Sequence, residues 1–435
     1  MTSDKPGGCP EKSSSLLHRY FQVDLDKVES ALRAIWRQTA ERDFAEDSER
    51  AKSLQSSPRV RAIFSNIIFL CSSEKTGVEH DVDELIGELC IAHPSRFFVV
   101  EFSAEKNYSD ANKSVLPIET FVSSRCALAH SGAHVCSEEV YIRTSREGFA
   151  GIPSLLLGLL VADVSAVMVL NCDPFFPCGS KGRRSCEDGS GVMELFSLLW
   201  PICDRVIYDS RQFSKYLSNG PRFIEHVGSL CKRAREEDGI VGASGCAGSL
   251  ENSGHGNLGV RDLSWVRLKG FCDSVAGLFE LPREQGAVRR IVRVVIVCSQ
   301  LSDEFVELPS DACLLGAWIL SRLGFTPTTV RKISGEPRGF EVLSRNLSGS
   351  EELKVIFCSR GDSIDNSFSA CVDEVIFDFA ADTRVPSARV ARGEALSKLD
   401  ISLARILVSE IRASGDGDEL AIISTMVHKL GELMA

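Results

Sequence analysis

Several features that mark common protein classes are absent from this chain of 435 residues. Its 16 cysteines include no C-x-x-C pair, which disfavours a zinc ribbon or a thioredoxin-like redox site. The most apolar stretch, 152–170, is interrupted by Pro153 and Asp163, whereas a membrane-spanning helix needs about 20 mainly apolar residues. We therefore expect no membrane partner, and interpret this stretch as a buried helix, a turn at Asp163 and a buried strand.

Catalytic templates are missing as well. The sequence contains no G-x-S-x-G, no G-x-x-x-x-G-K-[ST] and no H-E-x-x-H. Gly254 and Gly256 lie in a glycine-rich stretch and follow no expected strand, so their spacing does not predict a dinucleotide site. The residues predict no catalytic group, no cofactor and no metal site, and the chain is not expected to be an enzyme.

Composition is ordinary for a globular protein, with 44% hydrophobic and 25% charged residues. The length is sufficient for two or three domains with real cores. A net charge of -11 argues against a nucleic-acid partner, because a general nucleic-acid binder needs a basic face. The first residues contain no apolar signal core, and a cytoplasmic location is expected.

Most cysteines stand in apolar strings, such as Cys71 after Ile-Ile-Phe-Leu and Cys298 after Val-Val-Ile-Val. Because free cysteine commonly behaves as a small buried hydrophobe, we expect most of them to be reduced and structural. Cys172, Cys178 and Cys186 flank or lie in an expected loop with several basic residues, which could lower a thiol pKa. These three are redox candidates or, alternatively, incidental cysteines of an unstructured insertion.

Hydrophobic periodicity predicts an N-terminal α/β domain over 16–232 with a mostly parallel or mixed sheet. In this domain, strand-like apolar runs alternate with helical patterns. The expected strands are 61–71, 96–102, 139–143, 166–171 and 205–208, and the expected helices include 81–92 and 153–161.

A second domain, over 261–435, is expected to be α+β with an antiparallel sheet. Asp262 is a candidate N-cap, and Gly324 a candidate C-cap for the helical pattern 312–323. After a strand at 290–298, short polar turns join three further strand-like runs, which favours antiparallel pairing. These runs are 338–344, 353–358 and 372–379, and a final helix or helix pair covers 393–433.

Three segments have compositions that cannot bury enough apolar surface to offset the entropy of ordering. Residues 1–15 are expected to form a disordered tail, and 177–191 a loop. The segment 233–260 is expected to be a flexible linker or insertion, since it carries seven glycines between Gly239 and Gly259.

The word His93-Pro94-Ser95-Arg96 stands between an expected helix end and strand start. Its imidazole, hydroxyl and guanidinium could recognise a phosphate or a partner carboxylate. Alternatively, the word is a helix C-terminus with His93 favoured by the helix dipole and Arg96 paired to an acid. The residue types alone favour the structural alternative.

Tryptophan and arginine, which are enriched at binding hot spots, recur in two further words. Trp265 and Arg267 follow the candidate N-cap Asp262, and Trp318 and Arg322 lie four residues apart on one expected helix face. These residues are candidates for partner binding. The alternative is an amphipathic helix in which the tryptophan is packed and the arginine pairs with an acid.

Together these words resemble the glucose-6-phosphate dehydrogenase assembly protein (OpcA) family. The resemblance extends from about residue 25 to the C-terminal helix, and the words that carry it are His93–Arg96, Cys203–Ser210, Asp262–Leu268 and Trp318–Phe325. It implies a factor of the oxidative pentose phosphate pathway, without catalytic residues, that binds glucose-6-phosphate dehydrogenase and promotes its assembly or active state. His93, Ser95, Arg96 and the tryptophan and arginine pairs are then candidates for that contact.

Two other functions stay open at this point. One is a phosphosugar-binding enzyme of the same pathway, of lactonase or isomerase type, that uses His93 and Arg96 on substrate. The other is a redox-sensing adaptor. The position of His93 is a simple feature that distinguishes the enzyme from the other functions, because it lies either in a pocket with converging donors or on an open rim.

Overall fold

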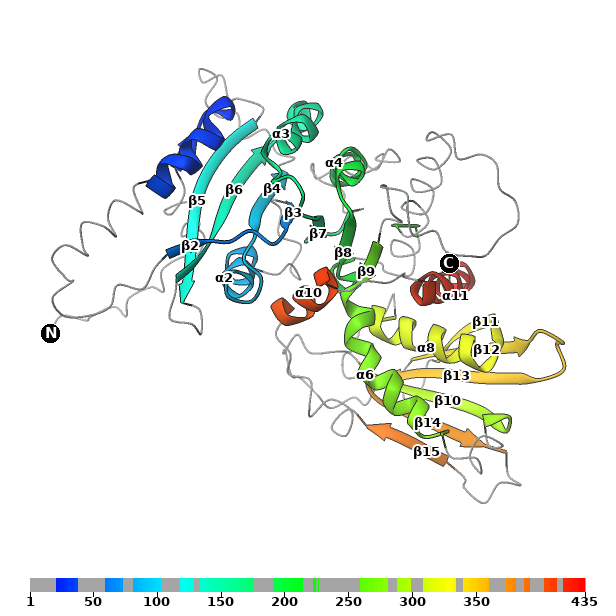
Figure 1. Ribbon diagram of the computed structural model, residues 1–435. Coiled ribbons are helices and arrows are strands. Elements are labelled where there is room, and N and C mark those ends of the chain that lie inside the picture. The colour runs from blue at the N-terminus through cyan, green and yellow to red at the C-terminus, as the bar shows by residue number, and fades with distance from the viewer. Residues whose placement is uncertain are drawn as a thin grey trace, which may run out of the picture.

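The computed structural model describes residues 21–37, 59–72, 81–102, 118–128, 134–174, 191–213, 222–223, 226, 259–280, 288–298, 308–333, 339–359, 372–380, 387–391, 403–412 and 418–434. These residues form two β-sheets with helices packed on them (Figure 1). The predicted fold class is confirmed, because a mixed, largely parallel sheet is followed by a sheet that is mostly antiparallel. The predicted tail over 1–15, almost all of the loop over 177–191 and residues 233–258 of the predicted linker lie outside the described residues.

The first sheet has nine strands among the described residues, in the order β1-β5-β6-β4-β3-β7-β8-β9, with β2 paired to β6. The six strands in the row from β6 to β9 are parallel to one another, and β2 is parallel to β6, while β5 runs antiparallel to β6 and β1 antiparallel to β5. The bounds are β1 Phe21–Val23, β2 Arg59–Arg61, β3 Asn66–Ser72, β4 Arg96–Phe102, β5 Ile118–Leu128, β6 His134–Thr144, β7 Ala166–Leu170, β8 Arg205–Tyr208 and β9 Gly259–Asp262.

The six parallel strands follow the order of a doubly wound sheet. Counted along the chain, β6, β4, β3, β7, β8 and β9 are strands 3-2-1-4-5-6, with β3 at the centre. Successive side chains of β3 enter opposite cores: Ile68 and Leu70 join one cluster, and Ile67 and Phe69 the other. Ligands of such sheets bind beyond the carboxyl ends of the strands, so that edge is the first place to look for a site.

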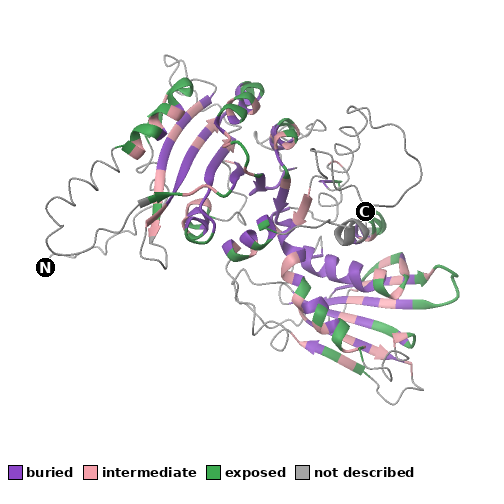
Figure 2. Ribbon diagram, in the orientation of Figure 1, coloured by how far each residue is buried: buried purple, intermediate pink, exposed green. Residues whose placement is uncertain are grey.

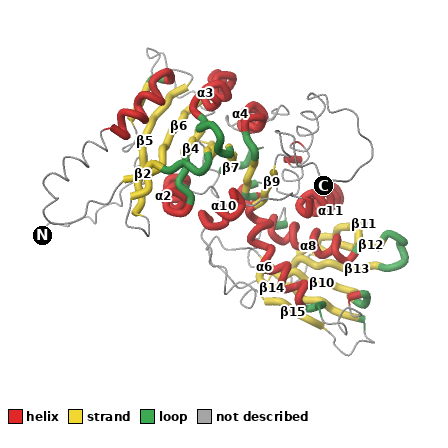
Figure 3. The backbone as a smooth tube through the Cα atoms, in the orientation of Figure 1, coloured by secondary structure: helices red, strands yellow, loops and turns green. Residues whose placement is uncertain are grey.

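Helices cover both faces of the first sheet, which gives three layers (Figure 3). One face packs against helix α2 and against α10 from the end of the chain. The other face packs against a helix over 28–37 and against α3 and α4. The bounds are α2 Val82–Ala92, α3 Ile152–Leu159, α4 Gly191–Leu199 and α10 Leu403–Arg412, with short 3-10 turns η3 Leu25–Lys27, η4 Arg146–Gly151, η5 Trp200–Ile202 and η6 Ser210–Gln212.

The second sheet has six strands among the described residues, in the order β11-β12-β13-β10-β14-β15. All pairs are antiparallel except β10 with β13. Helices α6 and α8 pack against each other over this sheet, and α11 packs against α8 and β11 (Figure 1). The bounds are α6 Leu263–Gly277, β10 Ile291–Cys298, α8 Ser310–Leu323, β11 Phe325–Ile333, β12 Gly339–Asn346, β13 Glu352–Ser359, β14 Val372–Phe379, β15 Ser387–Ala391 and α11 Asp418–Met434.

The C-terminal segment returns to the first sheet. Helix α10 packs on α2 and β8, although the predicted second domain over 261–435 contains it. Arg205 of β8 donates to the carbonyl of Ile411 at 2.8 Å, and Arg261 of β9 lies 3.3 Å from the carboxylate of Glu410. These contacts fasten α10 to the edge of the first sheet formed by β8 and β9, although the helix is distant in sequence from both strands.

Three local expectations are confirmed. The side chain of Asp262 accepts from the backbone N–H of Ser264 as the N-cap of α6, and Gly324 ends α8 with a φ of 74° in the left-handed region. The turn predicted within 152–170 is centred on Asp163, whose φ is 63°. Among the described helices, none combines the length and apolar content that crossing a membrane requires.

The central strands of the first sheet are largely buried (Figure 2). The free cysteines among the described residues are buried too, as the apolar strings predict. One pair departs from that expectation. Cys126 of β5 and Cys136 of β6 occupy directly opposed positions and form a disulfide. The sequence analysis did not find this pair because β5 was not predicted as a strand.

Candidate functional site

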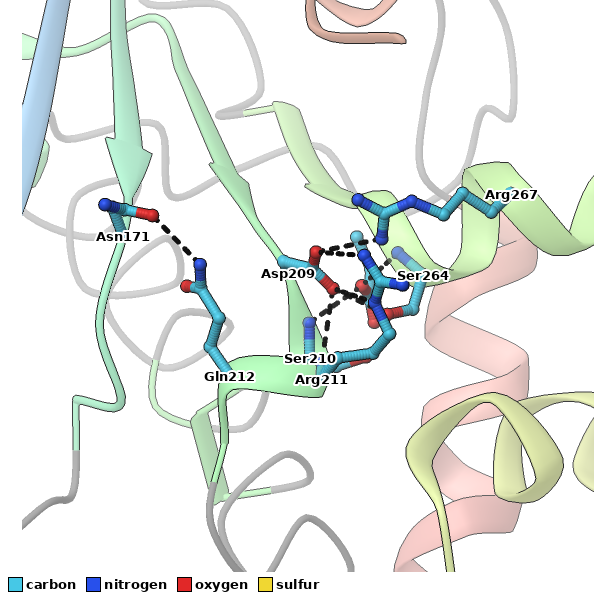
Figure 4. A network of polar contacts seen from close by, with 8 residues as sticks. Asn171, Asp209, Ser210, Arg211, Gln212, Ser264 and Arg267 are labelled. Carbon is cyan, nitrogen blue, oxygen red and sulfur yellow. Dashed lines mark hydrogen bonds and ion pairs between the residues drawn. The ribbon is translucent and has the colours of Figure 1, made fainter. Parts of the chain in front are cut away.

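A polar cluster lies where three neighbouring parallel strands end (Figure 4). Because β7, β8 and β9 are parallel, their carboxyl ends share one edge of the sheet. Asn171 follows β7, Asp209 follows β8, and Asp262 is the last residue of β9. We use the name Asp209 cluster for the group formed by Asp209, Ser210, Arg211, Asp262, Ser264 and Arg267.

The carboxylate of Asp209 is the centre of this cluster, and its side chain is only 2% exposed. Its Oδ1 accepts from the hydroxyl of Ser264 at 2.8 Å. Its Oδ2 accepts from Arg267 Nη1 at 2.8 Å and from Arg211 Nη2 at 3.0 Å. Charge-assisted bonds of this kind are the strong ones, so they fix the end of β8 to the first turns of α6. The side chains of Arg211 and Arg267 are each 16% exposed.

Asp262 adds a second carboxyl group to the cluster. Its Oδ1 accepts from the backbone N–H groups of Ser264 at 2.9 Å and Ser210 at 3.2 Å. Its Oδ2 is buried and has no hydrogen-bond partner in the described part of the chain. Burial, together with the nearby charge of Asp209, raises the pKa of Asp262 to about 7. The cluster therefore combines a carboxylate that accepts from two guanidinium groups with a carboxyl group whose pKa lies near 7.

A cavity of about 560 Å³ opens beside another face of α6. Its apolar walls include Trp265 of α6 and Trp318 of α8, which are both buried. Its charged lining residues are Lys269 and Asp273 of α6 and Arg322 of α8. The remaining lining residues are Cys272, Val275, Ala276, Phe279, Val288, Ile319, Leu323 and Phe377. We call this space the α6–α8 cavity.

The structure thus brings together two of the predicted partner-binding words. Trp265, from one word, and Trp318 and Arg322, from the other, line the same cavity. Arg267 does not line this cavity and instead belongs to the Asp209 cluster, where its side chain is 16% exposed. The expected amphipathic packing is therefore present in α6, with the indole packed and the arginine paired to an acid. Their contact with a partner stays a prediction.

The word His93–Arg96 lies elsewhere, at the amino ends of the parallel strands, where α2 ends and β4 begins. The ring of His93 is buried, with Nε2 2.5 Å from the hydroxyl of Ser65 and Nδ1 3.5 Å from a guanidinium nitrogen of Arg412. Burial lowers the pKa of His93 to about 4, and the charge of Arg412 acts in the same direction. The imidazole is therefore neutral at physiological pH and joins α2, β3 and α10.

Ser95 and Arg96 are also buried. Ser95 donates its hydroxyl to the carbonyl of His93 at 2.9 Å. Arg96 donates from Nε to Glu138 at 2.6 Å and lies 2.5 Å from Glu29 through Nη1, and it also bonds the carbonyl of Leu159 at the end of α3. In the described chain these contacts match the structural alternative for this word, in which the arginine pairs with an acid. The proposed contact with a partner stays a prediction.

Of the three redox candidates, the described residues include Cys172 alone. Cys172 is buried, with its thiol 3.6 Å from the carbonyl of Leu70. Cys178 and Cys186 lie outside the described residues. Within the described ranges no group of histidine, cysteine and carboxylate side chains has the geometry of a metal site.

Sequence reasoning missed several residues of the site. Asp209 and Arg211 were not singled out, although Asp209 directly follows the expected strand 205–208 and Arg211 lies two residues further on. Asn171 and Gln212, whose amide groups are joined at 2.9 Å, were missed in the same way (Figure 4). A polar residue directly after an apolar strand was the available signal, but it becomes specific only when the order of the strands is known.

Comparison with known proteins gives a partial likeness. The chain is 29% identical over 142 residues to a Nostoc punctiforme protein that carries the provisional name OxPP cycle protein OpcA. The match covers 33% of this chain and 23% of that protein, so it spans less than a quarter of the relative's length. No family model matches the chain.

Solved structures with a similar arrangement are distant in sequence. One is the WlbA dehydrogenase of Thermus thermophilus, solved with NAD and α-ketoglutarate, at 12% identity and a TM-score of 0.42 over 85% of this chain and 95% of that one. Another is the biliverdin reductase of Synechocystis, at 7% identity and a TM-score of 0.39 over 85% and 98% of the two chains. The assignment of the first sheet as doubly wound therefore rests on its strand order and not on these two structures.

Proposed function

We propose that the chain is a non-catalytic assembly or activation factor that binds glucose-6-phosphate dehydrogenase in the oxidative pentose phosphate pathway. The partial likeness to the Nostoc punctiforme OpcA protein supports this pathway. The observation that carries the proposal is the convergence of the words by which the sequence resembles that family. Two words meet in the Asp209 cluster, and two share the α6–α8 cavity.

The convergence is specific at the level of side chains. The word Cys203–Ser210 supplies Asp209, which bonds Ser264 and Arg267 of the word Asp262–Leu268. The word Trp318–Phe325 supplies Trp318 and Arg322, which line the cavity with Trp265. Residues separated by more than fifty positions thus organise one helix, α6, on two of its faces. A shared arrangement of this kind is expected when a set of words maintains one functional surface.

The first strand–helix connection of the doubly wound sheet supports the non-catalytic part of the proposal. In dinucleotide-binding sheets this connection carries G-x-G-x-x-G, whose glycines let the backbone approach the pyrophosphate. Here the connection between β3 and α2 contains one glycine, Gly77, together with Glu74 and Glu79. The G-x-G-x-x-G spacing formed by Gly254, Gly256 and Gly259 ends at the first residue of β9 and does not lie in the connection between β3 and α2.

The positions of His93 and Arg96 do not favour the alternative function, a lactonase or isomerase that uses both residues on substrate. Both side chains are buried and committed to internal partners. They also lie at the amino ends of the strands, whereas ligands of doubly wound sheets bind at the carboxyl ends. The isolated chain is accordingly expected to turn over neither glucose-6-phosphate nor its lactone.

The test is a titration of purified glucose-6-phosphate dehydrogenase with this chain. A factor that favours the assembled enzyme shifts its equilibrium only by its differential affinity for the two states. Activation should therefore be saturable and strongest at low dehydrogenase concentration, where the enzyme would otherwise dissociate. A sizing column should show the dehydrogenase moving to a larger species that contains this chain.

Two variants refine the test. Arg267→Ala and Trp265→Ala are expected to weaken activation, and Arg331→Ala, an exposed arginine on β11, is the matched control. Circular dichroism melts must accompany the assay, since Trp265 is buried. Full activation by variants that melt normally would place the contact elsewhere. A dehydrogenase whose activity and oligomer distribution both ignore the wild-type chain would refute the proposed function.

A further inference from the structure

The α6–α8 cavity has properties that protein contact alone does not require. Its volume of about 560 Å³ lies in the range of small-molecule sites, roughly 300–1,000 Å³. Two of the four tryptophans of the chain line it. The aromatic wall continues through Phe279 and Phe377, whose rings meet edge to face at 5.3 Å. Such a wall offers a flat apolar surface to a ring system.

The charged residues that line the cavity include more cations than anions. Lys269 and Arg322 contribute two cations and are exposed, and Asp273 contributes one carboxylate. The two cations come from different helices, which pack against each other. A molecule with its apolar body inside the cavity can therefore direct an anionic group to the exposed ends of these two side chains.

We propose that the α6–α8 cavity binds a small amphipathic organic anion, with a planar or ring-containing apolar body and one carboxylate, sulfonate or phosphate group. The body packs against Trp265, Trp318 and the phenylalanine rings. The anionic group lies between Lys269 and Arg322. This site is separate from the Asp209 cluster, which faces another side of α6, and the inference holds whether or not the chain binds a dehydrogenase.

Anilinonaphthalene sulfonate is a suitable probe, because it combines two ring systems with one anionic group. N-phenylnaphthylamine has the same apolar body without the sulfonate and is the neutral control. Energy transfer from tryptophan to the bound probe reports binding at the cavity, since Trp265 and Trp318 form its wall. We expect one saturable site per folded chain, and tighter binding of the sulfonate than of the neutral compound.

Charge variants test the anion contact. Lys269→Ala and Arg322→Ala should each weaken sulfonate binding by about threefold to tenfold, as expected for a single charge-assisted contact near the surface. They should leave binding of the neutral compound unchanged. Lys429→Ala on α11 and Arg331→Ala on β11 are matched controls, because both residues are exposed and do not line the cavity.

A filling variant tests the location. Ala276 lines the cavity from an exposed position of α6, so Ala276→Trp should occupy the space and abolish energy transfer. The exposed charge variants provide an independent test if this variant does not fold. Equal binding of the two compounds, with no effect of the charge variants, would overturn the proposal and favour an apolar seat for a partner's side chain. Failure of the folded wild-type chain to bind the sulfonate at one saturable site would also overturn it.

Discussion

Replacing Arg96 with methionine should destabilise the protein strongly, for a reason that does not involve a partner. Arg96 is 3% exposed and Glu138 is 1% exposed. The two oxygens of Glu138 are divided between donors: Oε2 accepts from Arg96, and Oε1 accepts from Trp36 and lies close to Arg61. The variant removes the donors of Oε2 and leaves a buried carboxylate half satisfied.

Breaking a buried ion pair by removing one member costs about 3–5 kcal/mol, because the other charge stays buried. In the variant, Arg61 still lies 2.7 Å from the second oxygen of Glu138 and continues to neutralise part of the buried negative charge. We therefore expect a loss near the lower limit, about 3 kcal/mol. The lost bond to the carbonyl of Leu159 acts in the same direction, since it leaves the end of α3 without this donor.

The assay is urea unfolding with a double-mutant cycle. Arg96→Met and Glu138→Leu should each be costly, and the double variant should cost less than their sum by about 1–3 kcal/mol, because residues in one network are coupled. Arg143→Met on β6 is the matched control. Its side chain is 38% exposed and lies 3.5 Å from Glu101, so its loss should stay below about 1 kcal/mol. Equal costs for Arg96→Met and Arg143→Met would refute the buried-network argument.

Three further predictions concern pH and packing. The pKa of His93 in the folded protein, about 4, lies below the usual 6.5, so its contribution to stability is present above pH 6.5 and is lost as the pH falls towards 4. Urea unfolding at several pH values should show a decrease in unfolding free energy on the order of 3 kcal/mol over this range, and this decrease should be absent in His93→Gln. Gly316→Ala should cost about 1–3 kcal/mol, because the new Cβ would lie 2.6 Å from a phenylalanine ring of β13, whereas Gly158→Ala, with open space, should be neutral or stabilising by thermal melt. Asp209→Asn should lower the pKa of Asp262 by removing a neighbouring negative charge, and a carbon-13 NMR titration that shows no downward shift would contradict this coupling.

The sequence predicted the buried elements well because their signals are local. The apolar run in β3, the helical spacing of α2 and the caps at Asp262 and Gly324 each depend on residues within a few positions. These elements lie in the two cores, where hydrophobic periodicity reflects burial directly.

The strands that were missed lie at or near the sheet edges. β11 is an edge strand that contains Pro327, and the pairing with β12 is irregular at that residue. A proline within a run weakens a strand prediction, and edge strands are the places that tolerate it. β5 carries Glu119 and Arg125 and pairs with β6 next to the short strand β1, so its pattern is more polar than that of the central strands.

Pairing across the second sheet was also beyond the local signal. The runs that became β13 and β14 are consecutive strands among the described residues, and short polar turns favoured their direct antiparallel pairing. Instead β10, which precedes α8, lies between them and is parallel to β13. The sheet is still mostly antiparallel, but its order depends on a strand inserted from an earlier part of the chain.

The position of α6 explains why the candidate site could be recognised only in three dimensions. The helix begins directly after β9, the last parallel strand, so its first turn is placed at the edge where Asp209 ends β8. Its later turns lie over the second sheet and form a wall of the α6–α8 cavity. One helix of 15 residues therefore connects a buried carboxylate of the first sheet to a cavity above the second. The sequence marked this helix through its cap, indole and arginine. However, Asp209, which pairs with Arg267, and Trp318, which lines the cavity together with Trp265, are each more than fifty positions away.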